Sequence, residues 1–225
     1  MEQQEAPARP RNRRGEGTRL REEIVRAAIA LIEREGSKEA VTLRAVAREV
    51  GIAAPSIYGH FPDREAVVEA VVAEALDRLN RMTTGARDSI ADPVDALLAG
   101  CAAYVEFGTR EPACYRIIFG SAPQRLATGA CRTPASPEGP EALMGLVRSL
   151  ETVVAAGRSA STDPFGDAVA LWTALHGQVT LRAALPDFPW PPTDTVEQLV
   201  RRLGRITDGP LPDAAAAEPA VTGGA

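Results

Sequence analysis

Residues 42–62 hold two short helical patterns separated by about three residues around Gly51, and this spacing constrains the fold more than any other feature of the chain. Thr42 is a typical helix N-cap, and the run LRAVAREV that follows it has apolar residues at helical spacing. Gly51 supplies the left-handed residue with which helices commonly end. Pro55 suits the first turn of the next helix, because its missing N–H would have no partner there. The pattern predicts a helix-turn-helix.

The segments on either side complete a small domain. Apolar residues recur at helical spacing from Thr18, a candidate N-cap, to Gly36, a candidate helix end. Asp63 is a candidate N-cap for a fourth helix that should run towards Thr83. We therefore expect residues 18–64 to form a helix-turn-helix domain with a core of three helices.

The remainder of the chain predicts further helices and no sheet. The expected helices cover residues 93–110, 112–120, 141–157, 163–185 and 193–206. Residues 1–17 are expected to be a disordered basic arm, residues 121–140 a mobile loop and residues 208–225 a disordered tail. The prediction is an all-α chain of about nine helices, in which residues 65–207 form a second helical domain.

Composition argues against several classes of protein. No apolar run reaches the roughly 18 residues that span a bilayer, and the N-terminus lacks an apolar signal segment. Cys101, Cys114 and Cys131 have no CxxC spacing, which suits reduced thiols, and we expect Cys101 and Cys114 to be packing residues of helices. The sequence has no nucleophile elbow, dinucleotide fingerprint, phosphate loop or HExxH motif. We expect a cytoplasmic protein that is not an enzyme, has no contact with membranes and uses no metal or cofactor.

Charge is unevenly distributed along the chain. The net charge is −5, yet residues 1–64 carry two more basic than acidic residues. A local basic excess marks a candidate nucleic-acid surface even in an acidic protein. Because a helix-turn-helix places its second helix in the major groove, where base edges can be distinguished, double-stranded DNA is the expected partner.

The run TLRAVAREVGIAAPSIYGHFPDREAV resembles the TetR/AcrR family of bacterial regulators. The resemblance covers about residues 18–70, and the matching positions are Thr42, Arg44, Ala47, Gly51, Tyr58, His60, Phe61 and Arg64. It implies an all-α homodimer with an N-terminal DNA-binding domain and a larger C-terminal domain for ligand binding and dimerisation. It further implies a repressor that binds a palindromic operator and is released by a small-molecule effector.

The resemblance also implies roles for single residues in and around the first helix of the motif. Thr42 would contact a phosphate at the N-terminus of its helix. Arg44 would reach a base edge, often that of a guanine. Arg64, where many members of the family carry lysine, would contact a phosphate.

The second helix of the motif would be the recognition helix. Pro55 and Ser56 would form its tip, and Tyr58 and His60 would grip the DNA backbone. The two alanines that precede Pro55 are small, so this tip offers few polar contacts to bases. Base recognition would therefore depend on Arg44, Ser56 and contacts with thymine methyl groups.

Apolar side chains of the middle helices are candidate walls of an effector cavity, which would suit a hydrophobic compound. These candidates are Tyr104, Phe107, Tyr115, Phe119, Met144, Trp172 and His176. The segment WTALHG places Trp172 and His176 on one helix face and resembles a motif of one TetR subgroup. His176 either lines the cavity or is a hydrogen-bonded core histidine beside a tight helix crossing at Gly177.

Two apolar stripes near the C-terminus predict a dimer interface. One comprises Leu171, Leu175, Val179 and Ala183, and the other comprises Val196, Leu199, Val200 and Leu203. Two such helices from each subunit would form a four-helix bundle. The alternative is that both stripes pack inside one subunit. For the protein as a whole, the alternative function is that of a helical adaptor that uses the same fold to bind another protein.

Overall fold

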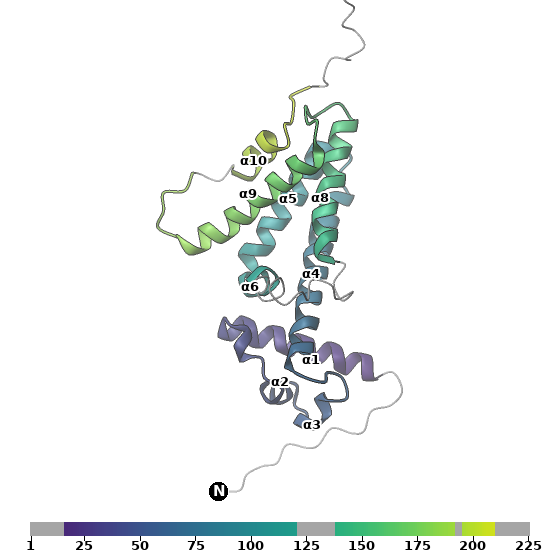
Figure 1. Ribbon diagram of the computed structural model, residues 1–225, viewed down its shortest axis with the longest axis vertical. Coiled ribbons are helices and arrows are strands. Elements are labelled where there is room, and N and C mark those ends of the chain that lie inside the picture. Colours follow the sequence, from purple (N-terminus) through teal and green to yellow (C-terminus); the bar gives the residue numbers. More distant parts are fainter. Residues whose placement is uncertain (1–15, 121–137, 192–194, 210–225) are drawn as a thin grey trace, which may run out of the picture. The chain divides into compact units, whose positions relative to one another are not determined.

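The computed structural model describes residues 16–120, 138–191 and 195–209, which form nine α-helices, a 3-10 helix and no strand (Figure 1). The prediction of an all-α chain is confirmed. The chain divides into two compact units, one of Met1–Asn80 with Phe107–Gly139 and the other of Arg81–Glu106 with Pro140–Ala225. The first unit therefore includes more of the chain than the expected domain at residues 18–64, because α6 packs on α1.

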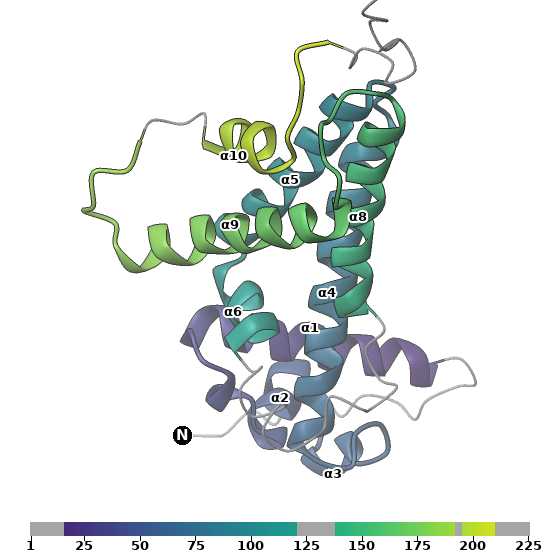
Figure 2. The same ribbon diagram turned by 45° about the horizontal axis from the view of Figure 1, so that its top comes forward.

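The first unit is built around α1 (Glu16–Glu35), which lies between α6 and the pair α2–α3 (Figures 1 and 2). Its other elements are the 3-10 helix η1 (Lys38–Ala40), α2 (Leu43–Val50), α3 (Ala54–Ile57), the first part of α4 (Arg64–Asp88) and α6 (Pro112–Gly120). Apolar side chains from all the α-helices form one core, which includes Ile24, Leu31, Val41, Val46, Ile57, Phe61, Val67, Val71 and Ile117.

The helix ends of this unit largely follow the predicted caps. The Asp63 carboxylate accepts a hydrogen bond from the Ala66 amide at 2.8 Å, so Asp63 caps α4 as expected. Gly36 and Gly51 both have positive φ, +68° and +76°, where their helices end. The N-cap predicted at Thr18 is wrong, because α1 begins two residues earlier and Thr18 lies within it. Residues 1–15 of the expected arm lie outside the described residues.

Two further helix boundaries differ from the sequence prediction, and one short helix was not predicted at all. α4 continues to Asp88, beyond the expected end near Thr83. α3 is only four residues long and ends at Ile57, although the backbone N–H groups of His60 and Phe61 still donate to its last carbonyl. The 3-10 helix η1 was not predicted from the sequence. It is capped by Ser37, whose hydroxyl accepts from the Glu39 amide at 3.2 Å.

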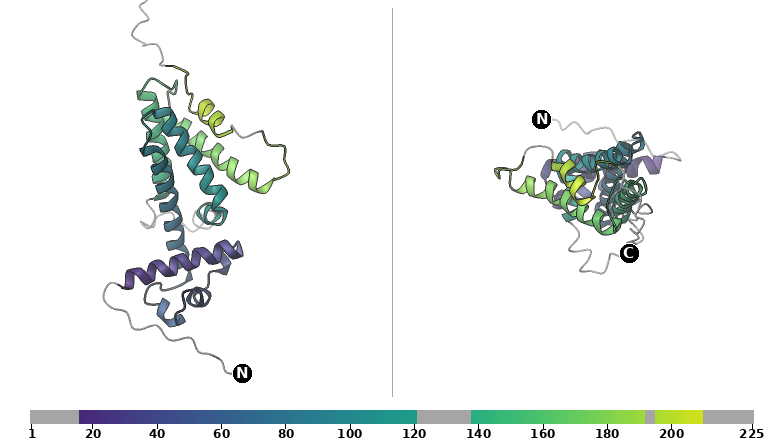
Figure 3. Two further views of the ribbon diagram at one scale, coloured as in Figure 1. Left: turned by 180° about the vertical axis from the view of Figure 1, so that it is seen from behind. Right: turned by 90° about the horizontal axis from the view of Figure 1, so that it is seen from above.

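The second unit contains α5 (Pro93–Arg110) as far as Glu106, α8 (Glu138–Ala155), α9 (Pro164–Ala184), α10 (Thr195–Leu203) and the end of α4. α10 packs beside α9, as the view from behind shows (Figure 3). The end of α10 is also held by the α8–α9 connection, because the Ser159 hydroxyl donates to the Gly204 carbonyl at 2.7 Å.

The ends of α8 and α10 require corrections. α8 begins at Glu138, so the expected loop at residues 121–140 is shorter at its C-terminal end; Pro140 is tolerated in a first helical turn. Residues 121–137 lie outside the described residues. α10 ends at Leu203 rather than near Ile206, because the backbone turns at Arg205, which has a φ of +49°. Of the expected tail, residues 210–225 are not described.

Most side chains of the apolar stripes predicted for dimerisation are buried or partly buried within the single subunit. Leu171, Leu175 and Val179 are buried in the single subunit, as is Val200, whereas Ala183 is exposed. The tight helix crossing predicted at Gly177 is wrong. A Cβ at this position would meet only the Leu181 side chain of its own helix, at 3.9 Å.

Cys101 and Cys114 are buried with free thiols, which confirms their predicted packing role, while Cys131 lies outside the described residues. In the part of the chain that the structure describes, no helix is both long enough and apolar enough to cross a bilayer.

A pair of glycine substitutions tests the turn of the helix-turn-helix. Gly51→Ala should lower the free energy of unfolding by about 1 kcal/mol, because an alanine in a left-handed conformation brings its Cβ too close to a carbonyl oxygen. Gly85→Ala in the interior of α4 should raise it by roughly 0.5–1 kcal/mol, because alanine favours helix. Neither new methyl group would meet any atom within 4 Å.

Urea denaturation of both variants measures the difference. Because each substitution adds one methyl group in open space, side-chain packing is matched between them. Changes of the same sign in the two variants would contradict the role given to the backbone conformation of Gly51.

Candidate nucleic-acid interface

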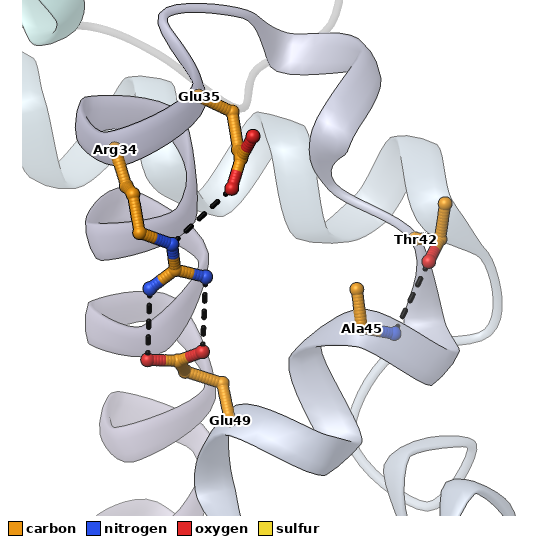
Figure 4. Close-up of polar contacts among 5 residues, drawn as sticks. All are labelled: Arg34, Glu35, Thr42, Ala45 and Glu49. Atoms are coloured by element: carbon orange, nitrogen blue, oxygen red, sulfur yellow. Dashed lines mark hydrogen bonds and ion pairs between the residues drawn. The ribbon is translucent and has the colours of Figure 1, made fainter.

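Thr42 fixes the start of α2. Its hydroxyl oxygen accepts a hydrogen bond from the Ala45 amide at 3.1 Å, as Figure 4 shows. The side chain is exposed, and a hydroxyl that accepts one bond can still donate its own proton. The N-terminus of α2 therefore presents a donor and the positive end of a helix dipole, an arrangement that suits a phosphate oxygen.

Arg34 connects the end of α1 to the end of α2. Its two terminal nitrogens donate to the two oxygens of Glu49 at 3.3 and 3.2 Å, and its Nε donates to Glu35 at 3.2 Å (Figure 4). The hydrogen bonds to Glu49 are the largest cause of the raised pKa of Arg34. An exposed ion pair of this kind adds little stability, but its two parallel hydrogen bonds fix the relative orientation of the two side chains. It helps to set the direction of α2 against α1.

Arg64 spans the turn that leads into α2. Its Nε donates to the Val41 carbonyl at 2.8 Å, and one terminal nitrogen donates to the Lys38 carbonyl, also at 2.8 Å. The other terminal nitrogen pairs with Glu65 at 3.2 Å. These bonds hold the residues directly before the Thr42 cap. The proposed contact of Arg64 with phosphate has to be made by a guanidinium already engaged with the protein backbone.

α3 is anchored from one side and exposed on the other. Ile57 and Phe61 are buried in the core, whereas Pro55, Ser56 and Tyr58 are exposed. Tyr58 is 61% exposed, the highest value among the large apolar side chains of the described residues. The structure thus brings three of the residues implied by the family resemblance onto one exposed, firmly anchored segment.

Two neighbouring arginines were not among the predicted site residues. Arg21 of α1 lies over the ring of Phe61, with its guanidinium carbon 4.6 Å from the ring centroid, and covers the buried end of the motif. Arg48 is exposed on α2, four residues after Arg44, so the two share a helix face. The four-residue spacing of Arg44 and Arg48 was visible in the sequence. The pairing of Arg21 with Phe61 was not, since it depends on tertiary packing.

His60 is partly buried close to the start of α1. A Cβ at Gly17 would lie 4.0 Å from its ring carbon Cε1. His60 therefore lies beyond the end of α3, next to the N-terminus of α1, and is less exposed than Ser56 and Tyr58.

One cluster in the first unit has ligand types that bind metals. Donor atoms of Glu33, Glu111 and Cys114 lie within 4.8 Å of one another. Glu111 is already paired with Arg78 at 2.9 Å, and burial raises the pKa of the Cys114 thiol to about 11. We assign no metal to this cluster.

The candidate effector walls are divided between the two units. Phe107, Tyr115 and Phe119 belong to the first unit, where the rings of Tyr115 and Phe119 have centroids 4.7 Å apart. The second unit contains the others, Tyr104, Met144, Trp172 and His176. Trp172 and His176 have ring centroids 6.3 Å apart on one face of α9. Burial lowers the pKa of His176, which favours the neutral imidazole.

An exposed, capped helix-turn-helix held on an all-α core defines a DNA-binding regulator as the class of protein. The family model described as bacterial regulatory proteins of the tetR family matches residues 24–71. The model of the tetracyclin repressor-like C-terminal domain matches residues 97–205. The HTH-type transcriptional regulator Rv0681 of Mycobacterium tuberculosis is 31% identical over 166 residues, which are 72% of this chain and 69% of that protein.

Solved structures share the fold. A protein of unknown function from Rhodococcus sp. RHA1 has a TM-score of 0.68 at 23% identity, and the match covers 83% of this chain and 94% of that chain. The TetR family transcriptional regulator PfmR from Thermus thermophilus has a TM-score of 0.58 at 20% identity, with 83% and 99% coverage. The chain therefore belongs to the TetR family of DNA-binding transcriptional regulators, which are transcription factors rather than enzymes.

The two hydrogen bonds of Arg64 give a prediction about stability. Arg64→Ala should lower the free energy of unfolding by about 1–2 kcal/mol, because two partly buried carbonyls lose their donor. Arg44→Ala should leave stability within about 0.5 kcal/mol of the wild-type value, because the Arg44 side chain is exposed. Thermal unfolding followed by circular dichroism distinguishes the two variants, and equal stability in both would contradict a positioning role for Arg64.

Proposed function

We propose that this regulator is a homodimeric repressor that binds a palindromic DNA operator and is released by a small hydrophobic effector. The observation that carries the DNA-binding part is the exposure of Ser56 and Tyr58 on a segment whose other face is buried. A rigid element that presents polar and aromatic side chains to solvent is what recognition of a groove requires.

The residues of the motif divide into two kinds of contact. Thr42, Tyr58 and His60 hold the DNA backbone and fix the position of the protein, without reading sequence. Arg44, together with Ser56 and Pro55 at the tip of α3, contacts base edges in the major groove. Arg64 contributes chiefly by holding the turn before Thr42, and its remaining N–H groups are available to a phosphate.

The proposed dimer follows from the apolar side chains that the single chain leaves uncovered near the end of α9. Leu181, Leu185 and Phe188 are each about half exposed. The segment after α9 folds back, with the indole N–H of Trp190 donating to the Leu185 carbonyl at 2.8 Å. An exposed apolar patch of this kind suits a two-fold interface, in which the same patch of each subunit faces its copy. Two-fold symmetry in turn favours a palindromic operator.

The effector part rests on the aromatic side chains of the middle helices. Tyr104, Trp172 and His176 offer an apolar surface with a neutral imidazole as a polar group. Such walls suit a hydrophobic or aromatic compound. The proposed switch is a change in α4, which contributes residues to both units.

Substitution of Tyr58 tests the DNA contact. Tyr58→Ala should weaken binding to promoter DNA from the neighbouring genes by about tenfold or more, because a backbone contact worth roughly 1.4 kcal/mol or more is lost. Thermal stability should not change, since the side chain is largely exposed. Gel-shift titrations at a fixed moderate salt concentration measure the affinities.

Arg110→Gln is a suitable control, because Arg110 is an exposed arginine outside the motif and the substitution removes one positive charge. It should leave DNA affinity close to that of the wild-type protein. Unchanged DNA binding by Tyr58→Ala would remove that residue from the interface. Absence of specific binding to any promoter would favour the adaptor alternative.

The dimer is tested by placing charge on its proposed surface. Leu181→Glu combined with Leu185→Glu should convert dimers to monomers in size-exclusion chromatography with light scattering, because four carboxylates would be buried at a two-fold interface. Phe165→Glu is the matched control, since Phe165 is equally exposed at the other end of α9. A double variant that remains dimeric would place the interface elsewhere.

A further inference from the structure

Arg87, near the end of α4, is a half-buried arginine whose hydrogen-bond partners are all uncharged. One terminal nitrogen donates to the Gly145 carbonyl at 2.9 Å and to the Ser149 hydroxyl at 2.8 Å. The other donates to the Thr84 hydroxyl at 3.1 Å. Among the residues that the structure describes, no carboxylate makes an ion pair with Arg87. Buried charges are normally paired, so this arrangement is unusual.

A second arginine converges on the same point. A Cβ at Gly145 of α8 would lie 3.4 Å from both terminal nitrogens of Arg87 and 3.9 Å from a terminal nitrogen of Arg148. Arg148 is more exposed and pairs with Glu141 at 2.7 Å. The absence of a side chain at Gly145 thus allows two guanidinium groups to approach each other over the surface of α8.

Arg87 keeps its charge in this half-buried position. Burial is the main cause of the lowered pKa of Arg87; the charge of Asp88 opposes it, and the charge of Arg148 acts in the same direction as burial. An arginine nevertheless stays protonated in proteins, so the repulsion is not relieved by loss of a proton. In the part of the chain that the structure describes, the one carboxylate paired with either guanidinium is that of Glu141, which is itself largely exposed.

We propose that Arg87 and Arg148, over Gly145, form a binding site for a small oxyanion, the carboxylate or phosphate group of a ligand. The oxyanion would displace the Glu141 carboxylate from Arg148 and accept hydrogen bonds from both guanidinium groups. Arg87 has five N–H donors, and its three bonds to protein oxygens leave two for such a ligand. The Ser149 and Thr84 hydroxyls keep Arg87 in place.

This inference deepens the proposed effector-controlled function, on which it rests for its biological role, because it adds an acidic group to the effector. An effector with an apolar body and one carboxylate or phosphate would fit both proposals. Oxyanion binding itself is independent of DNA, so the two proposals can fail separately.

Isothermal titration calorimetry of the full chain with sodium phosphate and with sodium hexanoate, in sodium chloride of constant ionic strength, tests the site. Wild-type protein should bind at least one of the two anions saturably. Arg148→Gln should weaken that binding by about tenfold or more, because a charge-assisted hydrogen bond is lost. Glu141→Gln should strengthen it, because the competing carboxylate is removed.

Arg201→Gln is the matched control. Arg201 is an exposed arginine of the same unit that pairs with Glu197 at 2.8 Å, and its loss should leave anion binding unchanged. The variants avoid Arg87 because its side chain packs against Gly100, where a Cβ would lie 2.8 Å from Arg87 Cδ, and its loss would disturb folding.

Several results would overturn the site. These are the absence of saturable binding of either anion, unchanged binding in Arg148→Gln, no gain in Glu141→Gln, or an equal loss in Arg201→Gln. The choice between anions identifies the group, since hexanoate binding alone indicates a carboxylate. If the site binds an anion but promoter affinity does not respond to it, the oxyanion site stands and the effector-controlled function fails for this class of ligand.

Discussion

The guanidinium group of Arg64 joins the start of α4 to the turn before α2, and the arrangement of the helix-turn-helix depends on this connection. By bonding the Lys38 and Val41 carbonyls at 2.8 Å each, it fixes the residues that lead to the Thr42 cap. The cap then sets the first turn of α2, Gly51 ends it, and Ile57 and Phe61 anchor the segment that follows. Arg34 and Glu49 fix the other end of α2 against α1. The exposed side chains of α2 and α3 are therefore presented by a backbone that is held at both ends, which is the condition for reading a DNA groove without a large cost in ordering entropy.

The second unit uses polar groups in a different way. Its short connection between α8 and α9 is held by buried serines, with Ser159 bonded to the Gly204 carbonyl and Ser161 to Asp167 at 2.6 Å. The Ser159 bond holds the end of α10 against the α8–α9 connection. Most of the apolar stripes of α9 and α10 are buried or partly buried within the subunit. The surface of this unit includes an apolar patch at the end of α9 and a pair of arginines on α4 and α8. In our account the first serves a second copy of the chain, and the second serves an anionic ligand.

Local signals in the sequence predicted the helices and most of their ends, because caps and turn glycines act through neighbouring residues. Thr42, Gly51 and Asp63 are examples, and each makes its hydrogen bond or adopts its backbone conformation within a few residues. The sequence also identified the exposed residues of α3 through the family resemblance.

The sequence did not predict the role of Arg64, whose partners lie 23 and 26 residues earlier in the chain. For the same reason, the contact of Arg21 with Phe61 and the convergence of Arg87 and Arg148 appear only once the chain is folded. The apolar stripes of α9 and α10 illustrate a second limit of sequence-based prediction. Periodicity identifies a buried helix face, but it does not say whether the surface that covers it belongs to the same chain.

We propose that the segment from the η1 turn to Phe61 is the surface that meets DNA. Hydrogen–deuterium exchange of the full chain, with and without promoter DNA from the neighbouring genes, tests this proposal. We expect bound DNA to slow exchange in peptides covering residues 38–61, with the largest change around Thr42 and Tyr58. Bound DNA that leaves exchange in these peptides unchanged would contradict it.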